Sequence, residues 1–197
     1  MEKRFLGKFT LVGLMVLLGL SLWLSGCGEP GYLDGLAGKR LGVYLETEAG
    51  SVSDLNAALT DYISRRTKLE VVGTRFTGEV REDPATYSRL RNELGLDYLL
   101  LVQLTDISPV RHRNDFDIAP GKMKMSLEYE CKLNLTYKVI DLATEAPALI
   151  GQKRGQAEET QSFHVDQGGF DFDFDPVDEE QLIEQAMFDA IHRSRLL

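Results

Sequence analysis

The residues best suited to covalent chemistry are the two cysteines, Cys27 and Cys131. Cys27 follows a basic head, an apolar run over residues 9–23 and the small residues Ser25 and Gly26. This order is typical of a secretory signal peptide, and the apolar run is shorter than the ~18 residues of a membrane-spanning helix. We therefore predict that residues 1–26 are a cleaved leader. The alternatives are an N-terminal transmembrane anchor or a chance cysteine after an apolar run.

The four residues 24–27, Leu-Ser-Gly-Cys, resemble the bacterial lipobox. The resemblance implies that the Cys27 thiol carries a diacylglyceryl group and that the new amino group is acylated. Several acyl chains would anchor the protein in a membrane almost permanently, and no other cofactor is expected. Gly28 stands where an aspartate would resemble an inner-membrane retention signal, so the expected location is the outer membrane, facing the periplasm.

The chain is acidic, with a net charge of −9. Residues 1–26 carry three basic side chains and one acid, so their removal leaves −11. Phosphate backbones and anionic lipid headgroups repel such a chain, which argues against nucleic acid and against lipid recognition by charge. Cys131 alone cannot close an intrachain disulfide, so packing must hold the core together.

No arrangement of side chains typical of catalysis is found in the sequence. His112, His164 and His192 are assigned to a loop, a strand end and a C-terminal helix, without metal-ligand spacing. Cys131 falls on the apolar side of a predicted strand, where a thiol is normally inert. We predict a protein that is neither an enzyme nor a metal binder. A hydrolase that acts on envelope polymer through scattered carboxylates is the alternative.

The most unusual segment alternates aromatic and acidic residues: Phe170, Asp171, Phe172, Asp173, Phe174 and Asp175. In an extended chain the phenylalanines would face one side and the aspartates the other. A standard calcium loop is excluded because Pro176 and Leu182 stand where a glycine and a glutamate are needed, although an irregular site stays open. The other interpretations are an edge strand that completes the core and a docking strand that adds to a partner's sheet.

The remaining pattern predicts the elements that must position these residues. Residues 28–38 read as a flexible tether after the lipidated Cys27, and the folded domain covers residues 39–197. Strands are expected over 41–45, 69–73 and 98–104. They are separated by a helix that begins after Ser53 and by a helix between Asp83 and Gly95.

Strict alternation over residues 122–139 predicts a long half-buried antiparallel strand with a partner at 148–165. Asp178 and Gln181 fit a capping box at the start of a final amphipathic helix. The fold class is therefore α+β. We expect a single two-layer sandwich, with a mixed sheet, a long antiparallel hairpin and three helices.

Three stretches, 55–72, 90–100 and 137–144, resemble one envelope superfamily. The second ends a helix with Leu-Gly-x-Asp-Tyr, and the third closes a strand with Val-Ile-Asp-Leu-x-Thr. Members include the curli-secretion lipoprotein, lipoprotein activators of penicillin-binding proteins and the amino-terminal domain of the Tol-Pal translocation protein. The chain departs from them at 145–147, where Glu-Ala-Pro replaces the usual glycine.

We accordingly expect a membrane-anchored envelope lipoprotein that acts as a binding adaptor or assembly protein for an envelope protein partner. The alternatives are a subunit of a secretion, export or lipopolysaccharide-transport assembly. Homo-oligomerisation is left open. The candidate partner-binding residues are those of the Phe/Asp segment, Phe170 to Asp175.

Overall fold

The folded unit runs from Gly31 to Leu197. Cys27 and residues 171–175 of the Phe/Asp segment lie outside the part of the chain that the structure describes. The computed structural model describes residues 31–47, 52–73, 80–108, 111–119, 122–166, 169–170 and 177–197.

Strands and helices alternate in the first half of the unit, and long strands dominate the second. In chain order the elements are η1 (Tyr32–Leu36), β1 (Arg40–Thr47), α2 (Val52–Arg66), β2 (Glu70–Gly73), α3 (Pro84–Leu94), β3 (Tyr98–Thr105), β4 (Arg111–Ala119), β5 (Lys122–Asp141), β6 (Ala146–Asp166), β7 (Gly169–Phe170) and α4 (Glu179–His192).

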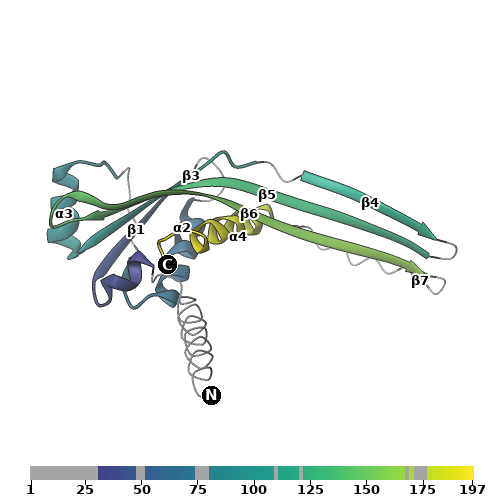
Figure 1. The fold of residues 1–197 in the computed structure, drawn as a ribbon, viewed down its shortest axis with the longest axis horizontal. Coiled ribbons are helices and arrows are strands. Elements are labelled where there is room, and N and C mark those ends of the chain that lie inside the picture. Colours follow the sequence, from purple (N-terminus) through teal and green to yellow (C-terminus); the bar gives the residue numbers. More distant parts are fainter. Residues whose placement is uncertain are drawn as a thin grey trace, which may run out of the picture. The chain divides into compact units, whose positions relative to one another are not determined.

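The strands form one mixed sheet in the order β2-β1-β3-β5-β6-β7, with β4 paired to β5. β1 is parallel to β2 and β3, whereas β5 is antiparallel to β3, β4 and β6. The hairpin of β5 and β6 is the longest feature, with strands of 20 and 21 residues (Figure 1). The predicted α+β class, mixed sheet, long hairpin and three α-helices are confirmed.

The ends of α3 follow from the residues that flank it. The Asp83 carboxylate accepts a hydrogen bond from the Thr86 backbone N–H at 2.7 Å, and Pro84 occupies the first turn. Gly95 ends the helix with a left-handed φ of 64°. These predicted boundaries are confirmed. The predicted N-cap at Ser53 is wrong, because α2 already begins at Val52.

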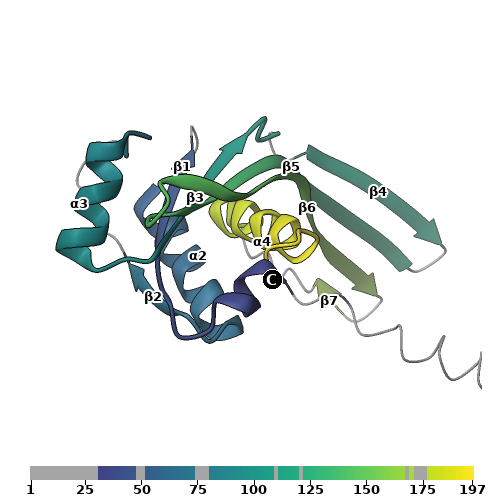
Figure 2. The same cartoon turned by 60° about the vertical axis from the view of Figure 1, so that its left-hand side comes forward.

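Helices cover both faces of the sheet. α2 and α4 pack on one face, and Tyr62 of α2 stacks on Phe188 of α4 with ring centroids 4.1 Å apart. α3 covers the opposite face at one end of the sheet, where Tyr87 and Leu90 pack on Leu99. The two-layer arrangement therefore extends over most of the sheet, and α3 adds local cover behind it (Figure 2).

Two glycines let β6 lie close to its neighbours. A Cβ atom on Gly155 would overlap the Ala186 carbonyl oxygen of α4, and one on Gly151 would overlap the Tyr137 hydroxyl of β5. A side chain at Gly155 would therefore force the backbone of α4 to shift, and one at Gly151 would displace the Tyr137 ring.

The start of the folded unit differs from the prediction. Residues 31–38 belong to it, because Leu33 of η1 is fully buried and its backbone N–H donates to the Leu196 carbonyl at 2.9 Å. The predicted flexible tether over residues 27–38 is therefore too long. The tertiary contact with the C-terminal residues orders a segment whose glycine content had suggested a linker.

Candidate interaction surface

β5 is paired along both of its edges. One edge faces β6 over its whole length, and the other faces β3 at residues 134–141 and β4 at 122–130. Between β3 and β4, Ser108 exchanges hydrogen bonds with the Lys132 backbone at 2.8 and 2.9 Å. Asp106 follows the end of β3 and has a left-handed φ of 51°. Its carboxylate accepts a hydrogen bond from the Asn134 side-chain amide at 2.6 Å. β4 thus continues the sheet where β3 leaves it.

The far end of the sheet continues beyond the helices. β4 and the adjoining parts of β5 and β6 pass the end of α4 (Figure 1). We call this end the ribbon and define it as β4, residues 122–130 of β5, residues 158–166 of β6, and β7. With a rise of ~3.3 Å per residue, the 20 residues of β5 span about 65 Å, which is well beyond an ordinary strand.

The register brings two wholly apolar rows together across the ribbon. Directly opposed residues of an antiparallel sheet share a face, so each row occupies one face of the sheet. The first row is Ile118, Met123, Val165 and Phe170, and the second is Phe116, Met125 and Phe163.

Burial on this face decreases from the body toward the tip of the ribbon. Leu127 is 9% exposed and Met125 is half-buried, whereas Met123 is 40% exposed. Leu127 belongs to the core cluster, and Met125 packs against that cluster, so the apolar side of β5 continues from the core toward the tip. The intervening rows are polar, as in Asp117, Lys124 and His164.

The Phe/Asp segment begins at the ribbon. Gly169 and Phe170 form β7, which pairs with Asp166 and Val165 of β6. Phe170 therefore continues the first apolar row. The residues from Asp171 to Asp175 lie outside the described part, so their role in binding stays a prediction.

Sequence reasoning missed β4 and the row that it completes. Residues 115–118, Asp-Phe-Asp-Ile, repeat the alternation of the Phe/Asp segment in a shorter form, and no strand was predicted there. The signal that could have found the strand is the Pro120-Gly121 turn dipeptide between this alternation and the one that starts at Lys122.

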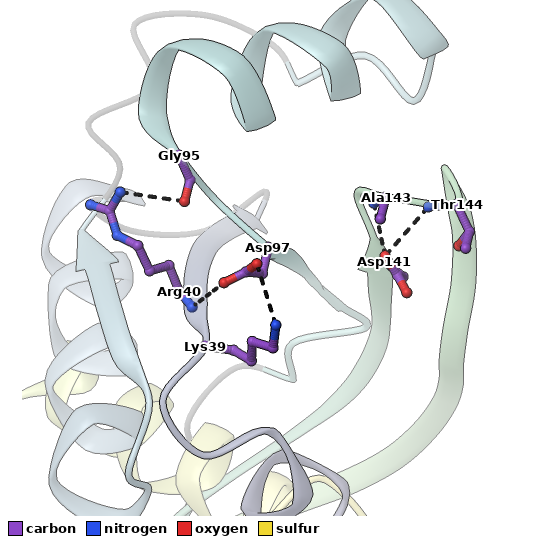
Figure 3. A network of polar contacts seen from close by, with 7 residues as sticks. All are labelled: Lys39, Arg40, Gly95, Asp97, Asp141, Ala143 and Thr144. Carbon is purple, nitrogen blue, oxygen red and sulfur yellow. Dashed lines mark hydrogen bonds and ion pairs between the residues drawn. The ribbon is translucent and has the colours of Figure 1, made fainter.

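The motifs of the superfamily resemblance hold strand ends together at the opposite end of the sheet (Figure 3). Asp97 accepts a hydrogen bond from the Arg40 backbone N–H at 2.9 Å, and Arg40 donates through its guanidinium to the Gly95 carbonyl at 3.3 Å. The Asp141 carboxylate accepts from the backbone N–H of Ala143 at 2.8 Å and of Thr144 at 3.4 Å. Each of these hydrogen bonds joins a side chain to a backbone group.

The turn after Asp141 leads into residues 145–147, where Glu-Ala-Pro replaces the glycine that the resemblance would have. Glu145 adopts a left-handed φ of 56°, a conformation that glycine adopts without strain. Glu145 therefore occupies a left-handed turn position at the place where the resemblance would have a glycine.

The groups that could do chemistry are scattered. Cys131 is fully buried, and burial, followed by the charge of Glu179, raises the pKa of its thiol. His112 lies in β4 and not in the predicted loop, and His192 ends α4. Within the described ranges no three His, Cys, Asp or Glu side chains are grouped as a metal site would require. The absence of an enzymatic activity stays a prediction.

A shallow groove lies on the side of the sheet that α3 partly covers. Its walls include Tyr44, Leu101 and Gln103, and an ion pair of 2.5 Å between Lys138 Nζ and Glu82 Oε2 lies at its rim. The cation and the carboxylate satisfy each other, so the groove offers no unpaired charge from this pair to a ligand.

No known protein family matches the sequence, and no curated protein is similar to it. Solved structures are similar at low identity. The C-terminal domain of LpoB from Salmonella enterica is 10% identical, with a TM-score of 0.34, over 68% of this chain and 90% of that one. A lipoprotein from Neisseria meningitidis is 12% identical, with a TM-score of 0.34, over 79% and 99%. The PelC dodecamer from Paraburkholderia phytofirmans is 12% identical, with a TM-score of 0.35, over 72% and 81%. These values are too low to assign a function to the chain.

Among the residues that the structure describes, no helix combines the length and the apolar character needed to cross a membrane.

Proposed function

We propose that this chain is a membrane-anchored bacterial envelope lipoprotein, held by acyl chains on Cys27, that binds another envelope protein without catalysing a reaction. The observation that carries the proposal is the pair of apolar rows on the ribbon. Met123, in the row nearest the tip, is 40% exposed. The lipobox resemblance at Cys27 supports the anchor.

An apolar surface on a paired sheet suits binding for two reasons. Burying it against a partner contributes roughly 25 cal/mol per Å² of apolar area. The strands beneath are hydrogen-bonded to one another, so little backbone entropy is lost on binding. Methionine and aromatic residues are also the types enriched at the centre of protein interfaces.

The backbone of the ribbon adds a second mode of contact. Among the described residues, β4 pairs only with β5, so its outer edge has no strand partner. An extended segment of a partner could add to such an edge by main-chain hydrogen bonds. The proposed site therefore combines the apolar rows, the β4 edge and the Phe/Asp segment from Phe170 to Asp175.

Site-specific photo-crosslinking in the native host tests the proposal. A photoreactive phenylalanine analogue at position 123 should give one discrete crosslinked envelope protein in the membrane fraction. The matched control is position 150, because Ile150 is also apolar, is 60% exposed and lies in β6 away from the ribbon.

A glutamate at the same place provides a second readout. Met123→Glu should reduce the recovery of the partner by at least about tenfold, since an interface charge without a partner costs more than 1.4 kcal/mol. Ile150→Glu should leave it unchanged. Equal crosslinking at both positions, or an adduct consisting only of a second copy of this chain, would contradict the adaptor role.

Anchoring is tested separately. Intact-mass measurement of the purified protein should show a chain that begins at Cys27 and carries acyl groups. The Cys27→Ser variant should lack them and leave the membrane fraction. An unacylated, membrane-free wild type would refute the anchor.

A further inference from the structure

Three segments that are distant in the sequence meet at one end of the folded unit. The Tyr32 backbone N–H donates to the Arg195 carbonyl at 2.9 Å, which joins η1 to the C-terminal residues. The Gly38 N–H donates to the Lys68 carbonyl at 3.1 Å, which joins the end of η1 to the segment after α2. Figures 1 and 2 show η1, the C-terminus and the carboxyl end of α2 side by side. We call this region the anchor end.

Basic side chains are concentrated at the anchor end of an otherwise acidic chain. They come from the end of α2 and from the residues after α4, and all of them are exposed. The set is Arg65, Arg66, Lys68, Arg193 and Arg195.

Two of these bases are paired within their own segment. Arg65 contacts Asp61 at 2.8 Å, and Arg193 contacts Asp189 at 3.0 Å. The other acids here are Asp34 of η1 and the terminal carboxylate of Leu197.

The other three bases have no carboxylate partner among the described residues. The Arg66 guanidinium lies over the Tyr62 ring at 4.4 Å from its centroid, and no ion pair joins Lys68 or Arg195 to a described acid. A negatively charged surface could therefore approach these side chains without first breaking an ion pair.

The length of the tether determines how far the anchor end can be from a lipid attached to Cys27. Only residues 28–30 separate Cys27 from Gly31. A fully extended chain covers at most ~3.6 Å per residue, so Gly31 lies within about 14 Å of the acylated Cys27. The headgroup layer of one leaflet accounts for roughly 5–8 Å of that distance. Gly31, which begins the anchor end, is thus held within about one Debye length of the headgroups.

We propose that the anchor end rests on the membrane surface, with Arg66, Lys68 and Arg195 in contact with anionic lipid headgroups. The inference depends on the acylation of Cys27 that is part of the proposed function. The net charge of the whole chain argues against contact with anionic lipid. The short tether, however, determines which end of the folded unit meets the membrane, and that end carries the three bases without a carboxylate partner among the described residues. Such contacts would fix the orientation of the folded unit on the membrane.

Fluorescence quenching by a headgroup-attached nitroxide lipid tests the orientation. The full-length lipidated protein is reconstituted into vesicles of phosphatidylcholine with about 30% phosphatidylglycerol, or without it. A dye is attached at Ser64→Cys, an exposed position in the last part of α2, or at Thr160→Cys, an exposed position on the ribbon. Cys131 is fully buried and Cys27 is blocked by lipid, so neither competes for the dye.

We expect strong quenching at position 64 and at least about fivefold less at position 160. In anionic vesicles, Arg66→Gln/Lys68→Gln/Arg195→Gln should reduce quenching at position 64 by at least about twofold. The matched control Arg89→Gln/Arg91→Gln/Lys153→Gln removes the same charge from exposed positions elsewhere and should change nothing.

Equal quenching at the two positions would overturn the orientation. If quenching at position 64 is strong but is the same in anionic and neutral vesicles and in the triple variant, the headgroup contact is overturned. Mass measurement of the same sample shows whether Cys27 is acylated, so a failed anchor is distinguished from a failed orientation.

Discussion

At the scale of single residues, the closest approach between the sheet and its helices occurs at Gly155. Its position leaves no room for a side chain, because the Ala186 carbonyl of α4 occupies the space of a Cβ. The Gln156 backbone N–H beside it donates to the Asp189 carboxylate at 3.1 Å. One glycine and one carboxylate thus fix how α4 lies on β6.

Replacing Gly155 should therefore destabilise the fold. We expect Gly155→Ala to lower the free energy of unfolding by about 1–3 kcal/mol, because α4 must shift to admit the methyl group. Gly35→Ala is the matched control, since no atom lies within 4 Å of a Cβ there, and it should stay within about 0.5 kcal/mol. Urea unfolding followed by circular dichroism measures both. Equal effects would show that the close approach is not energetically important.

At the scale of elements, the ends of α3 were predictable because local chemistry determines them. Asp83, Pro84 and Gly95 each act on backbone groups of the same helix, so the sequence alone contains the relevant information. The hairpin of β5 and β6 was predictable for a similar reason, since a period of two is a property of the strand itself.

The Asp83 cap makes the stability of α3 depend on pH. The hydrogen bond from the Thr86 backbone is the main cause that lowers the pKa of this carboxyl below its ordinary 3.8. A lowered pKa means that the stabilisation is fully present above the unfolded pKa and is lost as the pH falls through the folded one.

Asp83→Ala should therefore reduce the urea midpoint at pH 7, by about half a molar. The difference from wild type should shrink as the pH falls below about 4. The exposed Glu93 in the same helix, changed to alanine, serves as the control for loss of a charge. A difference that persists undiminished at pH 2.5 would mean that the carboxylate is not the source of the effect.

Other elements could not be predicted, because their structure depends on distant partners. β4 mixes charged and apolar residues and becomes a strand by pairing with β5. η1 is ordered by the buried contact of Leu33 with the C-terminal residues, which composition cannot show. The candidate site was predictable only in part. The alternation that starts at Phe170 is visible in the sequence, but its place in the same row as Met123 depends on the register of four strands.

At the scale of the whole molecule, stability should be unevenly distributed. The part of β5 at residues 134–141 lies between β3 and β6 and is covered by helices, whereas the ribbon lies beyond α4. Regions with less apolar burial open more easily than the core.

Hydrogen exchange followed by mass spectrometry should reveal this gradient. Peptides from residues 134–141 should exchange at least about tenfold more slowly than peptides from β4. Binding of the proposed partner should slow the β4 peptides and leave the others unchanged. Uniform protection across β4 and the core would show that the ribbon and the body open as one cooperative unit.

The pairing of β5 along both edges, with β6 on one side and with β3 and then β4 on the other, also has a mechanical consequence. Hydrogen bonds in an antiparallel sheet run across the strands, so a pull along β5 strains many of them together in shear. Peeling a hairpin open from its end would instead break them one at a time. Tension applied near Met123 therefore passes through β5 into β3 and β1 and reaches the start of the folded unit through the sheet itself. The same strand that presents the apolar rows could transmit force between the proposed partner and the proposed lipid anchor.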